Sequence, residues 1–234
     1  MYDIKETFRA NSVPEALELL RAHPGAIPVC GGTDVMIHLK ERKLRQAALV
    51  GIMDIASLQG IRLEQTGDLF IGPGTCFDSI YQNPLARACV PTLADACNQV
   101  GSPQIRSVAT IGGNLCNGAV SADSVPSLLV LNAELELTSL EGKRVVKAVD
   151  FHTGPGKTVL ETARELLTGI RIPKRPMKAT AENTSNSVSE TPWKLPRSAA
   201  RSTARCRRMG PSAILPSPLA WPPRVQSAVQ KQNR

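Results

Sequence analysis

The chain has 234 residues, 42% of them hydrophobic, which is enough apolar material for a globular core. Its net charge is +8, but residues 174–234 hold 12 of the 28 Lys and Arg and only 2 of the 20 Asp and Glu. The first 173 residues are therefore slightly acidic, which argues against nucleic acid as a partner of that region. No apolar run is long enough to span a membrane, and the six cysteines lack metal or iron–sulfur spacing, so we expect a reduced, cytoplasmic protein without a metal site.

The first hundred residues alternate between helix-like and strand-like patterns. Ser12 and Glu15 stand at capping-box spacing before an apolar helical face, which predicts a helix over 13–22. Residues 65–68 separate two short apolar runs and predict a hairpin. The other expected elements are strands over 27–30 and 47–53 and helices over 34–42, 77–82 and 92–100.

The later part of the chain continues this mixture. Residues 134–138 alternate between polar and apolar, and residues 144–149 are expected to return as their partner strand. A loop is expected over 151–157, and a strand at 165–172. Hairpins mixed with helices predict the α+β class, with two small α/β lobes and a ligand between them, and do not fit a doubly wound sheet.

Two glycine pairs are the candidate binding features. A β-prone approach over 108–111 leads to Gly112-Gly113, which are followed by Asn114 and by an apolar run over 125–131 that reads as a helix or buried segment. Consecutive glycines can adopt positive φ and admit a ligand closely, so we expect their N–H groups to converge on an anion such as a pyrophosphate. Asn114, Ser121 and Asp123 add donors and acceptors for hydroxyl groups.

The second pair, Gly31-Gly32, ends the apolar run over 27–30. Thr33 or Asp34 is placed to cap the following helix, whose N-terminal N–H groups favour a phosphate. An ordinary tight turn is the alternative for either pair. The P-loop and G-x-G-x-x-G patterns are absent from both.

Taken together, the stretches IPVCGGTDVMIHL and GSPQIRSVATIGGNLCNGAVSADSVPSLLVL resemble the FAD-binding domain of the molybdenum hydroxylases, also called the PCMH-type FAD-binding domain. Within that family the FAD subunits of bacterial xanthine dehydrogenases are most similar. The resemblance runs from about Ile4 to about Pro173, and it implies a domain over 1–173 whose two lobes clasp an extended FAD.

The resemblance also implies which residues contact FAD. These are Ile27, Pro28, Val29, Cys30, Gly31, Gly32, Thr33 and Asp34 on the pyrophosphate and adenosine side; Ala109, Thr110, Ile111, Gly112, Gly113 and Asn114 near pyrophosphate and ribityl oxygens; Asp123 on a ribityl hydroxyl; and Leu166 through its backbone. Helix capping is the alternative role for Asp34 and Asp123. Cys30 and Cys116 read as small packing residues rather than redox thiols, and no residue of this chain is expected to be catalytic.

The implied activity is that of an oxidoreductase subunit in a heterotrimer. A molybdenum-binding subunit would hydroxylate the substrate, an iron-sulfur subunit would carry [2Fe-2S] clusters, and FAD on this chain would pass the electrons to NAD+ in purine catabolism. The molybdenum cofactor and the clusters are expected only on the partner subunits. Two alternatives stay open: an inactive truncated remnant that folds but does not assemble, and an RNA-binding protein that uses the basic tail.

Residues 174–234 form that tail, rich in Pro, Ser and Arg. Their composition offers little apolar surface to offset the entropy of ordering, so we expect disorder. We hypothesise that the coding frame shifts between Pro173 and Met177, so that out-of-frame residues replace the family's C-terminal part.

Overall fold

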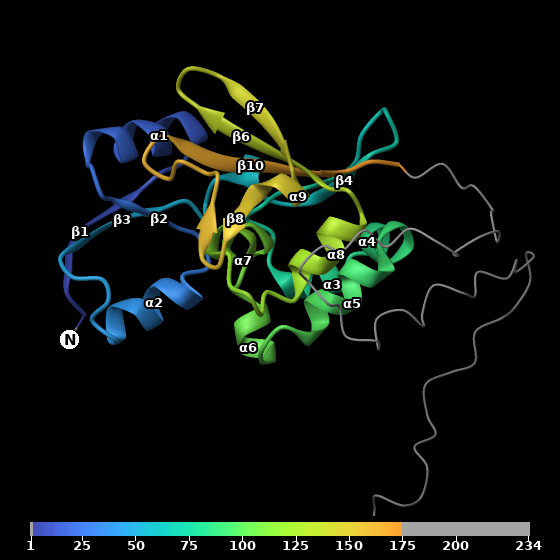
Figure 1. The fold of residues 1–234 in the computed structure, drawn as a ribbon, viewed down its shortest axis with the longest axis horizontal. Helices are drawn as coiled ribbons and strands as arrows, with labels where there is room; N and C mark the ends of the chain where they lie inside the picture. Colours follow the sequence, from blue (N-terminus) through green and yellow to red (C-terminus); the bar gives the residue numbers. More distant parts are fainter. Residues whose placement is uncertain (1, 175–234) are drawn as a thin grey trace, which may run out of the picture. The chain divides into compact units, whose positions relative to one another are not determined.

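The computed structural model describes residues 2–174, which form two lobes (Figure 1). The first lobe contains a three-stranded parallel sheet in the order β1-β3-β2. Its strands are β1 (Ile4–Arg9), β2 (Ile27–Val29) and β3 (Ala47–Gly51), and its helices are α1 (Val13–Ala22) and α2 (Thr33–Lys40). Helix α1 connects β1 to β2, and α2 connects β2 to the central strand β3.

The second lobe contains a five-stranded antiparallel sheet in the order β4-β5-β10-β6-β7. Most of the helices in the described chain lie in this lobe, together with the small hairpin β8-β9 (Figure 1). The strands are β4 (Ile61–Leu63), β5 (Leu69–Ile71), β6 (Glu134–Ser139), β7 (Lys143–Lys147), β8 (His152–Gly154), β9 (Lys157–Thr158) and β10 (Glu165–Ile172). The helices are α3 (Phe77–Gln82), α4 (Pro84–Cys89), α5 (Pro91–Gln99), α6 (Pro103–Arg106), α7 (Ile111–Asn117), α8 (Ser124–Val130) and α9 (Ala148–Phe151). The short helix η1 (Ala56–Leu58) precedes β4 and buries Leu58 in the core of the first lobe.

Helix α1 begins where its sequence predicts. The Oγ of Ser12 accepts the N–H of Glu15, which satisfies one of the backbone donors left over at a helix start. In a capping box the carboxylate of Glu15 would accept the N–H of Ser12. Here it accepts the N–H of Asn11, one residue earlier. The helix buries Ala16, Leu17 and Leu20 in the core of the first lobe.

Strand β10 joins the two lobes. It is central in the five-stranded sheet, and it also contacts α1 of the first lobe. Successive side chains of a strand point to opposite faces, so the neighbours Leu166 and Leu167 enter different cores. Leu166 packs into the core of the first lobe, while Leu167, Ile170 and Ile172 pack into that of the second.

A register shift between Leu167 and Gly169 interrupts the pairing of β10 with β6. A Cβ on Gly169 would lie 2.8 Å from the ring of Phe70, so this strand position has no room for a side chain. The irregularity therefore lies directly beside the pair of leucines that serves the two cores.

The α+β class and the two-lobed fold are confirmed, as are the hairpin around residues 65–68 and strand β10. The prediction of a β-like segment over 108–111 is wrong, because Thr110 makes only one isolated bridge to Cys76 and Ile111 already begins α7. The strand expected to reach residue 149 ends at Lys147, where α9 follows, and the loop over 151–157 contains most of the hairpin β8-β9. The expectations of disorder and of a shifted frame concern residues outside the described part.

One ion pair on β10 offers a test of the fold. Arg144 of β7 donates from Nε and Nη2 to the two carboxylate oxygens of Glu165, at 2.7 and 2.8 Å, and these bonds lower the pKa of Glu165. Glu165→Gln should reduce the free energy of unfolding by about 1 kcal/mol at pH 7, because the pair is bidentate but Arg144 is partly exposed.

A carboxylate with a lowered pKa stabilises the fold above its unfolded pKa of about 4.3, and this contribution is lost as the pH falls through the folded pKa. Urea unfolding at pH 7 and at successively lower pH should therefore show the free energies of unfolding of Glu165→Gln and of the unsubstituted chain becoming equal. Glu141→Gln, at an exposed turn, is the matched control. A deficit of Glu165→Gln that persists below both pKa values would contradict the assignment.

Candidate functional site

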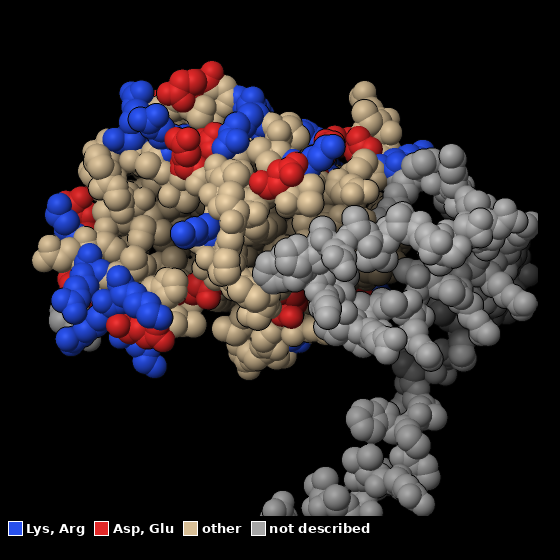
Figure 2. All heavy atoms as spheres, viewed as in Figure 1, with Lys and Arg blue, Asp and Glu red and all other residues tan. Residues whose placement is uncertain are grey.

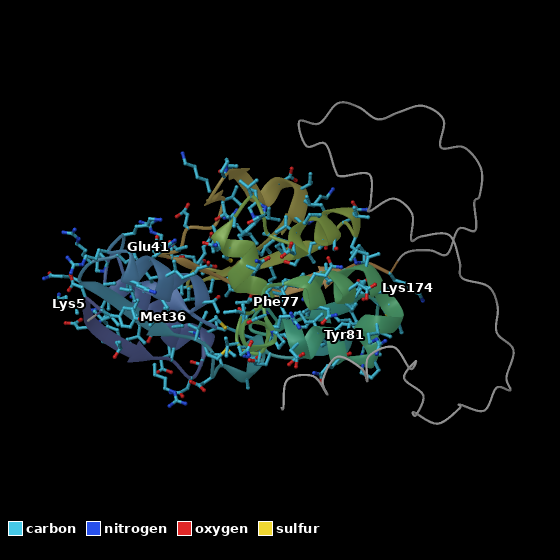
Figure 3. The ribbon with its side chains drawn as sticks, turned by 90° about the horizontal axis from the view of Figure 1, so that it is seen from below. Lys5, Met36, Glu41, Phe77, Tyr81 and Lys174 are labelled. Atoms are coloured by element: carbon cyan, nitrogen blue, oxygen red, sulfur yellow. The ribbon has the colours of Figure 1, made fainter. Side chains whose placement is uncertain are left out.

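A cavity of about 540 Å³ lies between the two lobes and is lined by residues from both. The first lobe contributes the turn from β2 into α2, and the second contributes α7, the start of α3 and strand β10. In Figure 3, Met36 marks α2 and Phe77 marks the start of α3. The volume is within the range of small-molecule and cofactor pockets, roughly 300–1,000 Å³.

Both glycine pairs line this cavity. A Cβ on Gly31 would lie 2.0 Å from the carbonyl oxygen of Val108, and one on Gly112 would lie 2.5 Å from the Cβ of Pro73. These two glycines therefore allow the backbone segments around the cavity to pack directly on one another. Of the four glycines, only Gly32 adopts the positive φ that glycine makes possible.

The second glycine pair is not an anion cradle. Its N–H groups lie in the first turn of α7, and each donates to an acceptor of the protein. The N–H of Ile111 donates to Thr75 O, that of Gly112 to Pro73 O, and that of Gly113 to the Oγ1 of Thr110. The expected convergence of these groups on a pyrophosphate is therefore wrong, because neighbouring segments already use them.

The first glycine pair does leave donors available. Gly32 is the N-cap of α2 with φ +69°, so Thr33 and Asp34 are the first residues of the helix rather than its caps. The N–H groups of Thr33, Asp34 and Val35 have no acceptor among residues 2–174. These groups and the positive end of the helix dipole make this end of α2 suited to an anion. Figure 2 shows Lys and Arg gathered at the other end of α2, where residues 40–43 and 45 are exposed.

Side-chain hydrogen bonds organise the polar wall of the cavity. Asn117 donates from Nδ2 to Asp34 Oδ2 at 3.0 Å and so links α7 to α2. The fully buried Ser124, at the start of α8, donates from Oγ to Asn114 Oδ1 at 2.7 Å. Asp34 is the sole charged residue that the described chain contributes to the lining.

The structure brings most of the expected cofactor residues together. Those that line the cavity are Ile27, Pro28, Cys30, Gly31, Gly32, Thr33, Asp34, Ala109, Thr110, Gly112, Gly113, Asn114 and Leu166. Val29 and Ile111 are absent from the lining, because they pack against or within hydrophobic cores. Asp123 is also absent: it is exposed before α8 and, within residues 2–174, its side chain caps no helix.

Sequence reasoning missed the apolar wall and one polar residue. Leu58, Phe77, Val100, Ile105, Leu160 and Leu167 line the cavity and come from segments far apart in the sequence. Asn117 lies three residues after Asn114, on the same side of α7. Reading this stretch as a helix instead of a loop would have found it.

Two thiols in the lining are protonated at neutral pH. Burial raises the pKa of Cys116 to about 12 and also raises the pKa of Cys30. Cys30 Sγ lies 3.4 Å from Met53 Sδ, so it has a soft, weakly polar neighbour. Because the thiolate is the reactive form, these positions are suited to packing rather than to redox chemistry.

Residues 2–174 offer neither a candidate metal cluster nor a candidate membrane span. They contain no group of three or more His, Cys, Asp or Glu arranged to hold a metal ion. Their helices are too short or too polar to cross a membrane.

Comparisons with known proteins agree on a single family. A family model described as the FAD binding domain in molybdopterin dehydrogenase matches residues 3–175. The xanthine dehydrogenase FAD-binding subunit of Escherichia coli O157:H7 is 41% identical over 176 residues, which are 75% of this chain and 60% of that protein. The nicotinate dehydrogenase FAD-subunit of Eubacterium barkeri is 36% identical over 172 residues, which are 71% of this chain and 57% of that protein.

A solved structure gives the same result. The crystal structure of Cu,Mo-CO dehydrogenase matches with a TM-score of 0.71 at 35% identity and covers 75% of this chain and 61% of that chain. The present chain thus spans about 60% of the length of the curated relatives it matches.

The glycine contacts predict different outcomes for neighbouring substitutions. Gly112→Ala should destabilise the fold by about 2 kcal/mol or more, because the new methyl group would overlap the backbone of Pro73. Gly113→Ala should change stability by less than about 1 kcal/mol, since its methyl group would meet only Thr110 Oγ1, at 3.0 Å. Urea unfolding measures both, and equal losses would contradict the packing role of Gly112.

Thiol alkylation tests the buried cysteines. With iodoacetamide at pH 8 (about 4 units below the pKa of Cys116), the thiolate fraction of Cys116 is very small. Among the cysteines of residues 2–174, mass spectrometry should find the exposed Cys89 modified first, and Cys97 and Cys116 modified only after unfolding in urea. Early modification of Cys116 in the folded protein would show that this wall of the cavity opens.

Proposed function

The chain belongs to the family of FAD-binding domains in molybdopterin dehydrogenases, and from this we propose that it is the flavin subunit of a xanthine dehydrogenase-like molybdenum hydroxylase. In this role it accepts electrons from [2Fe-2S] clusters on an iron-sulfur subunit, after a molybdenum-binding subunit has hydroxylated a purine. NAD+ is the proposed final acceptor. The observation that supports this most directly is that both glycine segments line one cavity.

The residues of the cavity fit parts of FAD. The N–H groups of Thr33, Asp34 and Val35 are suited to the diphosphate, since a backbone donor in a partly buried site forms strong bonds to an anion. Asp34 is suited to accept a ribose hydroxyl, because its other partner is the Asn117 amide. Phe77, Leu166 and Leu167 supply apolar surface for the aromatic ring systems.

FAD, when bound, supplies a redox group that exchanges electrons with the clusters and with NAD+. The contribution of this chain is to hold and orient it. Residues 2–174 hold no group of three or more His, Cys, Asp or Glu that could bind a metal, and burial raises the pKa of the lining thiols Cys30 and Cys116. Substrate hydroxylation is therefore assigned to the partner subunits, in a cytoplasmic heterotrimer.

A second candidate is a remnant that folds but does not assemble. The RNA-binding alternative depends on the basic residues of the tail, which lie outside the described residues.

Titration of the 234-residue chain with FAD tests the proposal. We expect micromolar or tighter binding, measured by the quenching of flavin fluorescence. Gly113→Leu should abolish binding, because its side chain would extend from the cavity wall. Gly154→Leu is the matched control, since Gly154 does not line the cavity and has open space around its Cβ.

Three outcomes of this experiment are distinct. A folded chain that binds no FAD would favour the remnant. Binding that is insensitive to Gly113→Leu would move the site elsewhere. Anaerobic NADH should reduce the bound flavin; if FAD binds but NADH leaves it oxidised, NAD+ is not the acceptor.

A further inference from the structure

The side-chain amide of Asn114 is held in one orientation. Its oxygen accepts the hydroxyl of Ser124 at 2.7 Å, which is the usual length of an O–H···O bond and short for an N–H···O bond. A serine hydroxyl has one proton to donate, and this proton is directed at Asn114 Oδ1. Ser124 is fully buried, so water does not compete for the bond.

The amide nitrogen of Asn114 is consequently the group left for a ligand. Asn114 lines the cavity, and its Nδ2 has no acceptor among residues 2–174. The other donors of α7 are engaged: the N–H groups of its first turn bond to the protein, and the Asn117 amide bonds to Asp34. Asn114 therefore offers this wall of the cavity a hydrogen-bond donor, while its oxygen is engaged by Ser124.

We propose that Ser124 is a positioning residue that fixes Asn114 as a hydrogen-bond donor to an acceptor oxygen of FAD, either on the diphosphate or on a ring carbonyl. The inference rests on the proposed function and extends it to a residue outside the cavity lining. It also narrows the expectation that Asn114 supplies a donor or an acceptor to the donor alone. A ligand atom that can only donate is disfavoured at this position.

Substituting the amide by an isosteric carboxylate separates the two orientations. In Asn114→Asp, one oxygen still accepts from Ser124, but the other presents lone pairs and negative charge where the NH₂ group had been. We expect FAD affinity at pH 8 to fall at least about tenfold, and further than in Asn114→Ala, which only removes the donor. If Asn114 instead met FAD through its oxygen, Asn114→Asp would bind as the unsubstituted chain does, and the proposal would be overturned.

A double-mutant cycle tests Ser124. Ser124→Ala should weaken FAD binding by about two- to tenfold, the range of one hydrogen bond. In the Asn114→Ala background the same substitution should have no further effect, because there is no amide left to orient. Equal losses in both backgrounds would make Ser124 merely structural. Ser127→Ala, on the same helix and bonded to Thr92 O, is the matched control and should bind FAD normally.

Urea unfolding of each variant separates loss of binding from loss of fold. If Ser124→Ala does not fold, the comparison of Asn114→Asp with Asn114→Ala still decides the orientation. The inference fails alone if the unsubstituted chain binds FAD and Asn114→Asp binds equally well. It fails together with the proposed function if the folded, unsubstituted chain takes up no FAD.

Discussion

The arrangement of the molecule depends on the packing of two adjacent leucines on opposite faces of β10. Leu166 enters the core of the first lobe and Leu167 that of the second, so one strand anchors both. Burying each leucine contributes about 1.5–3 kcal/mol. Both residues also border the cavity, and the contacts that hold the lobes together therefore form part of its wall. The cavity exists because the two lobes share this strand while each keeps its own core.

The two glycine segments look alike in sequence but have different physical roles. At α2 the helix start leaves backbone donors without acceptors, and the basic residues lie at the opposite end. At α7 the backbone N–H groups donate to the turn around Pro73 and to Thr110. Polar side chains therefore supply the hydrogen-bonding groups on this side of the cavity. One segment thus contributes main-chain donors and the other contributes oriented amides. This asymmetry suits a ligand with an anionic part and a part rich in neutral acceptors.

Local patterns in the sequence were sufficient to predict much of the fold. The cap at Ser12 and the turn at residues 65–68 are local signals, and each marks an element that is present. The segment before Gly112 was predicted wrongly, because Thr110 caps a short helix that begins at Ile111 instead of continuing a strand. The cavity was predictable through its glycines and Leu166, since the family resemblance identifies them. The apolar wall was not, because Leu58, Phe77 and Val100 meet only through long-range packing.

The close approach of Gly31 to the carbonyl of Val108 has a consequence for how this domain can vary. The contact is between main-chain atoms, so no exchange of side chain at position 108 could make room for a residue larger than glycine at position 31. Compensating mutations, which commonly rescue a crowded core, are therefore closed to this pair. The two segments are separated by more than seventy positions in the chain, yet their backbone conformations must be kept together for the contact to persist. Recombination between two related sequences can separate these segments only if both sequences have the same backbone conformation around positions 31 and 108.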